Sequence, residues 1–443
     1  MKIQLSDHFT YGRLLRFTLP SIVMMIFTSI YGVVDGIFVS NFAGKTAFAA
    51  VNLIMPYLMA TGVIGFMIGT GGTALISMTL GMGDRKKANE LFSLLTYVSI
   101  AGGLVLTVIS VIFMRPVAVM LGAEGQMLED CVLYGNIIQI ALTAYVLQFA
   151  FQSFCIAAEK PNLSLAMMVT AGVCNILLDA LFVALFRWGL VGAAVATASA
   201  QIIGAVIPLV YFLRPNDSLL RLGKCRFDGK ALIRTCTNGS SELMSNLSMS
   251  LVSMLYNLQL IRYAGENGIA AYGVIMYVNF IFVAIFIGFV IGSAPIIGFN
   301  HGADNRPELQ NMFRKSLVII GVFAAAMTAA ALLLARPLSK IFVGYDQELM
   351  EMTVRGFVIY AFSFLVCGFN IFGSSLFTAL NNGLISAVIS FVRTLICQIA
   401  AVLLLPLVLG LDGIWWAIVV SEGVALILTV FCFVKLKDRY HYM

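Results

Sequence analysis

Two aspartates, Asp35 and Asp179, lie deep within long apolar stretches of this chain. A carboxylate in hydrocarbon costs several kcal/mol unless it is protonated, paired or hydrated, so intramembrane acids usually mark the path of an ion or a proton. Asn175 stands one helical turn before Asp179, and Tyr31 one turn before Asp35, so each pair shares a helix face. These residue types predict a site that binds a cation or holds a shared proton. The alternative is two unrelated acids bonded to different neighbouring helices.

A second polar pattern has the spacing of one helix face. Its members are Glu242, Asn246, Met249, Ser253 and Asn257. A single polar stripe on an apolar helix is typical of the wall of a wet cavity. We therefore predict a substrate cavity, to which later segments add Met276, Asn279 and Asn370. Methionine suits such a surface because its flexible thioether adapts to varied ligands.

The elements that position these residues are predicted to be membrane-spanning helices. Hydrophobic residues make up 60% of the chain and charged residues 11%, against about 25% charged in soluble proteins. Several apolar stretches exceed the roughly 20 residues that span a bilayer. Twelve helices are expected, over residues 12–41, 47–82, 89–114, 127–158, 163–186, 190–213, 229–262, 267–300, 309–335, 346–379, 384–408 and 412–435. The first helix is too long for the core of a removable signal peptide.

The distribution of basic residues predicts the orientation. With alternate loops assigned to one side, that side holds 19 of the 27 lysines and arginines. The positive-inside rule then places both termini in the cytoplasm. The net charge of +6 follows from this bias, so it does not indicate nucleic-acid binding.

Residues about 221 positions apart match over most of the chain. Arg115-Pro116-Val117 pairs with Arg336-Pro337-Leu338, for example. Six helices per copy make both copies enter the membrane in the same direction, so we expect two parallel lobes, residues 1–213 and 229–443, joined by a linker at 214–228. In such an architecture the substrate site lies between the lobes, near the bilayer midplane.

The repeat also shows that the two acids belong to one lobe only. Position 35 corresponds to Tyr256 and position 179 to Ala400. Both aspartates are expected roughly 10 Å below the outer ends of their helices, which favours one shared site. Pro20, on the same helix as Asp35, removes one backbone hydrogen bond. It predicts either a hinge or a fixed kink.

The sequence resembles the multidrug and toxic compound extrusion (MATE) family, within it the branch of DNA-damage-inducible protein F and MepA-like exporters. The resemblance covers essentially the whole chain. Its most specific parts are Leu19-Pro20, Val34-Asp35-Gly36-Ile37-Phe38-Val39, Gly81-Met82-Gly83-Asp84-Arg85-Lys86-Lys87, Ala157-Ala158-Glu159-Lys160-Pro161, Asn175-Ile176-Leu177-Leu178-Asp179 and Gly239-Ser240-Ser241-Glu242.

The resemblance implies a V-shaped, all-α membrane protein that exports organic cations or amphipathic drugs in exchange for H⁺ or Na⁺. It implies a first-lobe coupling site whose residues are Tyr31, Asp35, Asn175, Asp179 and Thr197, and, with Na⁺ as the ion, a set of ligands from Asp35, Asn175, Asp179 and Thr197. Protonation there would bend the first helix at Pro20. The expected protein is a monomer of the bacterial cytoplasmic membrane, in contact with lipid, and is not an enzyme; no cofactor beyond the coupling ion is expected.

Two other functions stay open. A lipid-linked sugar flippase of the wider superfamily would need basic cavity residues for a pyrophosphate, and Arg355 and Arg393 are the candidates. An intramembrane enzyme would need a nucleophile with its base, or metal ligands, at membrane depth. Glu422, which aligns with Gln201, is expected either to bond between helices or to take part in function. The substrate and the coupling ion are not decided by the sequence.

Overall fold

The computed structural model describes residues 3–38 and 45–443, with the side chains of residues 33, 35–37, 45 and 48 left outside that description. The side chain of Asp35 thus lies outside the described residues, although its backbone belongs to α1. The first half of the chain forms α1 (Tyr11–Phe38), α2 (Lys45–Gly81), α3 (Arg85–Met120), α4 (Gly125–Ile140), α5 (Leu142–Ala157), α6 (Pro161–Asp179), the π-helix η2 (Ala180–Leu185) and α7 (Gly189–Leu213).

The second half is also helical. It forms α8 (Gly229–Gly302), α9 (Arg306–Val343), α10 (Gln347–Ala361), α11 (Phe364–Ala379), α12 (Gly383–Phe391), the π-helix η3 (Val392–Cys397), α13 (Gln398–Leu409) and α14 (Leu411–Tyr440). Nine helices of the described chain are long and apolar enough to cross a membrane, and the bent pairs α4–α5 and α10–α11 raise that number to eleven.

The long helix α8 is a hairpin of two helices. Its backbone breaks at Gly265, whose φ of 60° favours glycine. The rings of Tyr256 and Tyr272 stack with centroids 5.0 Å apart, whereas 16 residues of straight helix would separate them by about 24 Å. The two arms of α8, residues 229–264 and 266–302, therefore cross separately, which agrees with the expected helices 229–262 and 267–300.

Two expected helices are sharply bent. The bend between α4 and α5 is 54° at Ala141, and that between α10 and α11 is 48° at Phe362 and Ser363. Ala141 and Phe362 are 221 positions apart, so the two halves repeat the bend as well as the sequence. Neither bend contains the proline that causes most sharp kinks, so the sequence did not indicate them.

Helices α3 and α9 continue beyond their expected ends, Met114 and Ala335. Pro116 and Pro337 lie inside them rather than at their ends. Proline is tolerated in membrane helices where neighbouring groups satisfy the freed backbone. The prolines therefore do not end these helices.

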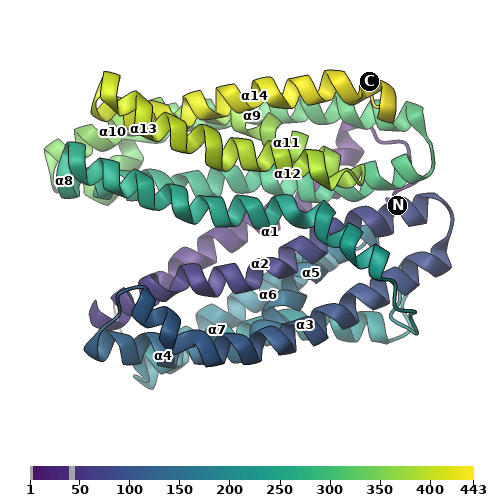
Figure 1. Cartoon of the computed structure of the whole chain (residues 1–443), viewed down its shortest axis with the longest axis horizontal. Coiled ribbons are helices and arrows are strands. Elements are labelled where there is room, and N and C mark those ends of the chain that lie inside the picture. The colour runs from purple at the N-terminus through teal and green to yellow at the C-terminus, as the bar shows by residue number, and fades with distance from the viewer. Residues whose placement is uncertain (1–2, 39–44) are drawn as a thin grey trace.

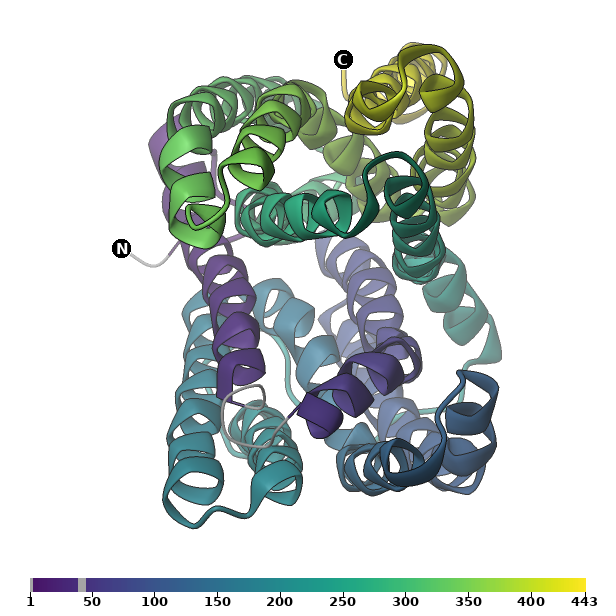
Figure 2. The same ribbon diagram turned by 90° about the vertical axis from the view of Figure 1, so that its left-hand side faces the viewer.

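The helices gather into two bundles, α1–α7 and α8–α14, and both ends of the chain lie on the same side of the molecule (Figure 1; Figure 2). We call this side the terminal side. One apolar core occupies the second bundle, and two smaller cores occupy the first. The second-bundle core also includes Leu5, Phe9, Leu14, Phe17 and Ile22.

Helix α1 therefore belongs to both bundles. A Cβ on Gly288 or Gly292 of α8 would lie within 3.0 Å of the backbone of Ser21 and Ile22 or of Thr18, which shows how closely this end of α1 packs on the second bundle. Further along, Phe27 and Tyr31 pack on Gly172 of α6 in the first bundle. α1 runs through Pro20 as one helix in this conformation, and Pro20 lies within the stretch of α1, Thr18 to Ile22, that packs on the second bundle.

Glycines bring the two bundles into backbone contact near the terminal side. A Cβ at position 239 would lie 1.9 Å from the carbonyl oxygen of Met67, and one at position 71 would lie 2.1 Å from that of Thr235. The same arrangement recurs between Gly302 and Met78, at 2.0 Å. Small residues of this kind allow membrane helices to approach closely. The bundles are thus closed against each other at the terminal side.

This contact predicts the effect of a single methyl group. Gly239→Ala should lower the free energy of unfolding by about 1–3 kcal/mol, because the α2 and α8 backbones must separate to accept it. Gly423→Ala is the matched control, since a Cβ there meets nothing within 4 Å. The measurement is thermal unfolding of the purified protein in detergent. Equal melting temperatures for the two variants would contradict the close contact.

Candidate functional site

The first candidate site lies in the first bundle, where α6 ends. Asp179 is the last residue of α6 and is fully buried, and Asn175, one turn earlier, is 2% exposed. The Asn175 amide Nδ2 donates a hydrogen bond to the hydroxyl Oγ1 of Thr197 on α7, at 3.4 Å. The structure therefore brings together Asn175 of α6 and Thr197 of α7, two of the residues that the resemblance implies for the coupling site.

Tyr31 approaches the same helix from α1. Its ring lies against Gly172, one turn before Asn175, and tilts against Phe27 with centroids 6.0 Å apart. Asp35 follows one turn later in α1, and its side chain is outside the described residues. We call the described residues Tyr31, Asn175, Asp179 and Thr197 the first-bundle polar cluster.

A π-helix follows the cluster directly, which sequence reasoning missed. η2 begins at Ala180, immediately after Asp179. Single π-helical turns of this kind occur frequently at functional sites. No residue type in Ala180–Leu185 marks the change of helix, so only the structure reveals it.

The oxygen atoms of this cluster suit a small cation or a proton. The Asn175 Oδ1 atom is buried and accepts no hydrogen bond within the described part of the chain. A carbonyl oxygen, a carboxylate and a hydroxyl are oxygen ligands of the kind that hard cations prefer. The same groups could hold a proton on a carboxylate. The donor set therefore fits Na⁺ and H⁺ alike.

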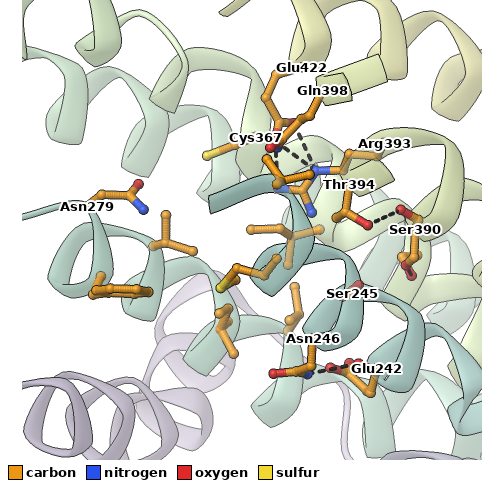
Figure 3. Close-up of a pocket in the computed structure, with 18 of the residues that line it drawn as sticks. Glu242, Ser245, Asn246, Asn279, Cys367, Ser390, Arg393, Thr394, Gln398 and Glu422 are labelled. Carbon is orange, nitrogen blue, oxygen red and sulfur yellow. Dashed lines mark hydrogen bonds and ion pairs between the residues drawn. The ribbon is translucent and has the colours of Figure 1, made fainter. Parts of the chain in front are cut away.

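The second candidate site is a cavity between the bundles, of about 740 Å³. Seven of the eight residues expected in a substrate cavity line it: Glu242, Asn246, Met249, Ser253, Asn257, Met276 and Asn279. Figure 3 shows Glu242, Asn246 and Asn279 around this space. We call it the central cavity. Most of its wall comes from α8 and the helices that follow it.

Aromatic and small polar residues complete the wall. The first bundle contributes Met25, Phe66, Thr70 and Ser153, among others, and the second bundle adds Tyr256, Tyr272, Tyr277, Phe280 and Tyr360. Aromatic faces attract organic cations through their quadrupole. The cavity can therefore bind flat or cationic molecules of several shapes.

Asn370, the eighth expected residue, lies behind the wall of the central cavity. It is fully buried, and its amide Nδ2 donates to the Glu422 carboxylate at 2.7 Å. Its Oδ1 accepts from the Thr429 hydroxyl at 2.8 Å. Asn370 thus orients Glu422 rather than facing the cavity.

An ion pair lies in the cavity wall, and one of its members is Glu422, whose role the sequence left open. The guanidinium of Arg393 donates from Nε to both oxygens of Glu422 at 2.9 Å, and its Nη2 lies 2.8 Å from Oε1 (Figure 3). Arg393 belongs to the π-helix η3, and Glu422 to α14. The side chain of Glu422 is 2% exposed. Glu422 therefore bonds between helices, which is one of the two alternatives that the sequence left open for it.

Glu242 differs from this pair. Its side chain is half-buried and makes no hydrogen bond or ion pair to another described side chain, while its backbone oxygen accepts from Asn246. Among the described residues that line the cavity, the charged ones are Glu242, Arg393 and Glu422. Because Arg393 and Glu422 neutralise each other, Glu242 gives the central cavity a net negative charge when ionised.

The pair predicts a difference between single and double variants. Glu422→Gln should lower the free energy of unfolding by about 3 kcal/mol, because the partly buried Arg393 loses its counter-charge. The double variant Arg393→Gln/Glu422→Gln should regain much of this loss. Exposed Glu351→Gln serves as the control, and thermal unfolding in detergent is the measurement. A single variant as stable as the double one would show that the pair does not hold the cavity wall.

Comparisons with known proteins agree with this architecture. The MatE family model matches residues 20–181 and again residues 243–403, one stretch in each half of the chain. The multidrug export protein MepA of Staphylococcus aureus (strain MSSA476) is 23% identical over 430 residues, covering 97% of this chain and 94% of the relative. MepA of Staphylococcus haemolyticus (strain JCSC1435) is 24% identical over the same length.

Solved structures show the same fold. A MATE protein crystallised in complex with MaL6 superposes with a TM-score of 0.92 at 21% identity, covering 97% of this chain and 98% of the other. An outward-facing multidrug resistance MATE transporter of the MOP superfamily gives 0.90 at 22% identity, covering 96% and 95%. The expected all-α MATE fold is confirmed, and so is the expectation of a transporter in place of an enzyme. The chain belongs to the MatE (MATE) family of membrane transporters.

Proposed function

We propose that this multidrug efflux transporter is a secondary active antiporter, which exports cationic or amphipathic organic compounds in exchange for H⁺ or Na⁺. The observation that carries the proposal is Glu242, half-buried and without an ion-pair partner among the described residues, in a central cavity of about 740 Å³ between the bundles. A carboxylate surrounded by aromatic and methionine side chains offers a cation both charge and apolar contact.

Coupling is assigned to the first-bundle polar cluster. The buried acid Asp179, with Asn175 one turn earlier and Thr197 hydrogen-bonded to Asn175, supports this assignment because an ionisable side chain in a membrane-spanning helix usually marks the path of an ion or a proton. Asp35 is assigned to the cluster from the sequence. Na⁺ would be held by Asp35, Asp179, Asn175 and Thr197, whereas H⁺ would bind a carboxylate; Tyr31 borders the same site.

Transport by alternating access would move residues 1–213 against residues 229–443 about the linker 214–228. α1 contacts both bundles, so a change in its shape near Pro20 would alter how they pack. Ion binding at the cluster would bend α1, narrow the central cavity and release the exported compound. This order of events is supported by the position of Pro20, which lies where α1 packs on the second bundle, about two to three turns before Phe27 and Tyr31 pack on the first.

The proposed setting is the cytoplasmic membrane of a bacterium, with a monomeric protein in contact with lipid and both termini in the cytoplasm. MepA, the relative described above, is bacterial. With that orientation, the glycine contacts at the terminal side close the cytoplasmic side, so this conformation faces outward. A flippase for lipid-linked sugars is less well supported, because the basic residue of the cavity, Arg393, is already paired with Glu422.

Removal of either proposed coupling acid should abolish gradient-driven transport. Asp35→Asn and Asp179→Asn should each reduce the efflux of a cationic dye at least tenfold, since neither amide can carry the proton or balance the ion. The readout is dye efflux from cells, normalised to the amount of transporter in the membrane. Asp438→Asn, an exposed acid near the end of α14, is the control. Wild-type rates in both coupling variants would overturn the assignment.

Neutralising Glu242 should weaken binding selectively. Glu242→Gln should lower the affinity for a cationic dye on the order of tenfold, about 1.4 kcal/mol, and leave an uncharged analogue of similar shape unaffected. Fluorescence titration of the purified protein measures both affinities. Glu266→Gln, on an exposed acid next to the turn of α8, is the control. Equal losses for the charged and uncharged compounds would show that Glu242 does not select for charge.

A further inference from the structure

A second recess, separate from the central cavity, lies on the terminal side of the first bundle. It measures about 740 Å³ and is formed by the start of α6, the end of α7 and the linker. Leu163, Ile207 and Val210 form its apolar wall. Arg214 and Arg221 of the linker form its basic edge. An apolar wall with a basic edge suits a phospholipid, because its acyl chains are apolar and its phosphate is negatively charged.

Hydrogen bonds fix the linker turn that carries the two arginines. The Asn216 amide Nδ2 donates to the carbonyl oxygens of Tyr211 and Arg214, at 3.1 and 3.0 Å. The backbone N–H and the hydroxyl of Ser218 donate back to Asn216 Oδ1. The backbone N–H of Arg221 donates to Asn89 Oδ1 of α3 at 2.7 Å. The basic edge is therefore a built surface of the first bundle.

The charges around the recess leave an excess of positive charge. Its acid, Asp217, accepts hydrogen bonds from Lys160 at 2.7 Å and from the Tyr211 hydroxyl at 3.2 Å. Within the described part of the chain, the Arg214 guanidinium has no polar partner. The Arg221 guanidinium donates to the carbonyl of Asn216 and has no carboxylate partner. Lys160, Arg214 and Arg221 thus outnumber the one carboxylate.

An exposed apolar stripe leads from the recess into the membrane-spanning part of α7. Ile202, Val206 and Val210 are 47%, 46% and 37% exposed and recur every four residues on one helix face. Val210 belongs to both the stripe and the recess. A hydrocarbon chain could therefore follow α7 while its headgroup stays at the recess.

We propose that this recess binds one anionic phospholipid of the cytoplasmic leaflet, with its phosphate at Arg214 and Arg221 and an acyl chain along α7. The proposal rests on the proposed orientation, which places the recess at the cytoplasmic surface. Arginine holds phosphate oxygens through two parallel N–H donors. Basic pockets between membrane helices on this side are suited to anionic headgroups.

Native mass spectrometry of the full-length protein in detergent tests the site, with added phosphatidylglycerol or phosphatidylcholine as the probe. The wild type should retain phosphatidylglycerol in preference to phosphatidylcholine. Arg214→Gln/Arg221→Gln should bind phosphatidylglycerol about tenfold more weakly. The matched control Lys224→Gln/Arg226→Gln removes two charges from the same linker outside the recess and should bind like the wild type. Arg214→Gln alone tests the site without touching the Arg221 hydrogen bond.

Three outcomes would overturn the proposal. They are unchanged binding in both recess variants, an equal loss in the control pair, and equal retention of the two lipids by the wild type. Lipid binding in detergent needs neither an ion gradient nor an exported compound. A negative result for lipid binding would therefore not argue against antiport, and a negative result for antiport would not argue against lipid binding at the recess.

Discussion

A charged side chain inside a bilayer needs a partner, water or a proton, and this constraint accounts for the surroundings of three described acids of the membrane-spanning helices. Glu422 meets it with Arg393 and Asn370, on three different helices. Glu242 meets it by lying half-buried at the central cavity, where water or a cationic compound can reach it. Asp179 is fully buried beside Asn175, whose Oδ1 accepts nothing from the described residues. In the proposed function these three acids have three roles: support of the wall, binding of a compound, and coupling.

The polar cluster lies in the first bundle and the central cavity lies between the bundles, and α1 contacts both bundles. Its first turns pack on Gly288 and Gly292 of the second bundle, and Phe27 and Tyr31 pack on Gly172 of the first. The segment before α1 is also held by the second bundle, since the backbone N–H of Phe9 donates to Glu308 at 2.9 Å. A change at the polar cluster therefore has a short physical route to the contact between the bundles.

The sequence predicted the helices well because hydrophobic length is a local signal. It also predicted the polar stripe from Glu242 to Asn257, since helical spacing alone places these residues on one face. It did not predict the Arg393–Glu422 pair, which joins residues 29 positions apart on separate helices. The bends at Ala141 and Phe362 and the π-helices η2 and η3 were also missed, because no proline or other residue type in these segments marks them. Asn370 shares its polarity with the cavity residues, yet packing turns it toward Glu422.

We propose that coupling at the first-bundle polar cluster and binding of the exported compound in the central cavity are separate functions of separate sites. The most direct measurement compares dye affinity with dye flux in one preparation of Asp179→Asn, reconstituted into liposomes with pH and Na⁺ gradients imposed separately. The account predicts near wild-type affinity for a cationic dye without any gradient, together with loss of flux under whichever gradient drives the wild type. A lower affinity for the dye, together with an unchanged transport rate for each dye molecule that does bind, would contradict the separation of coupling from binding.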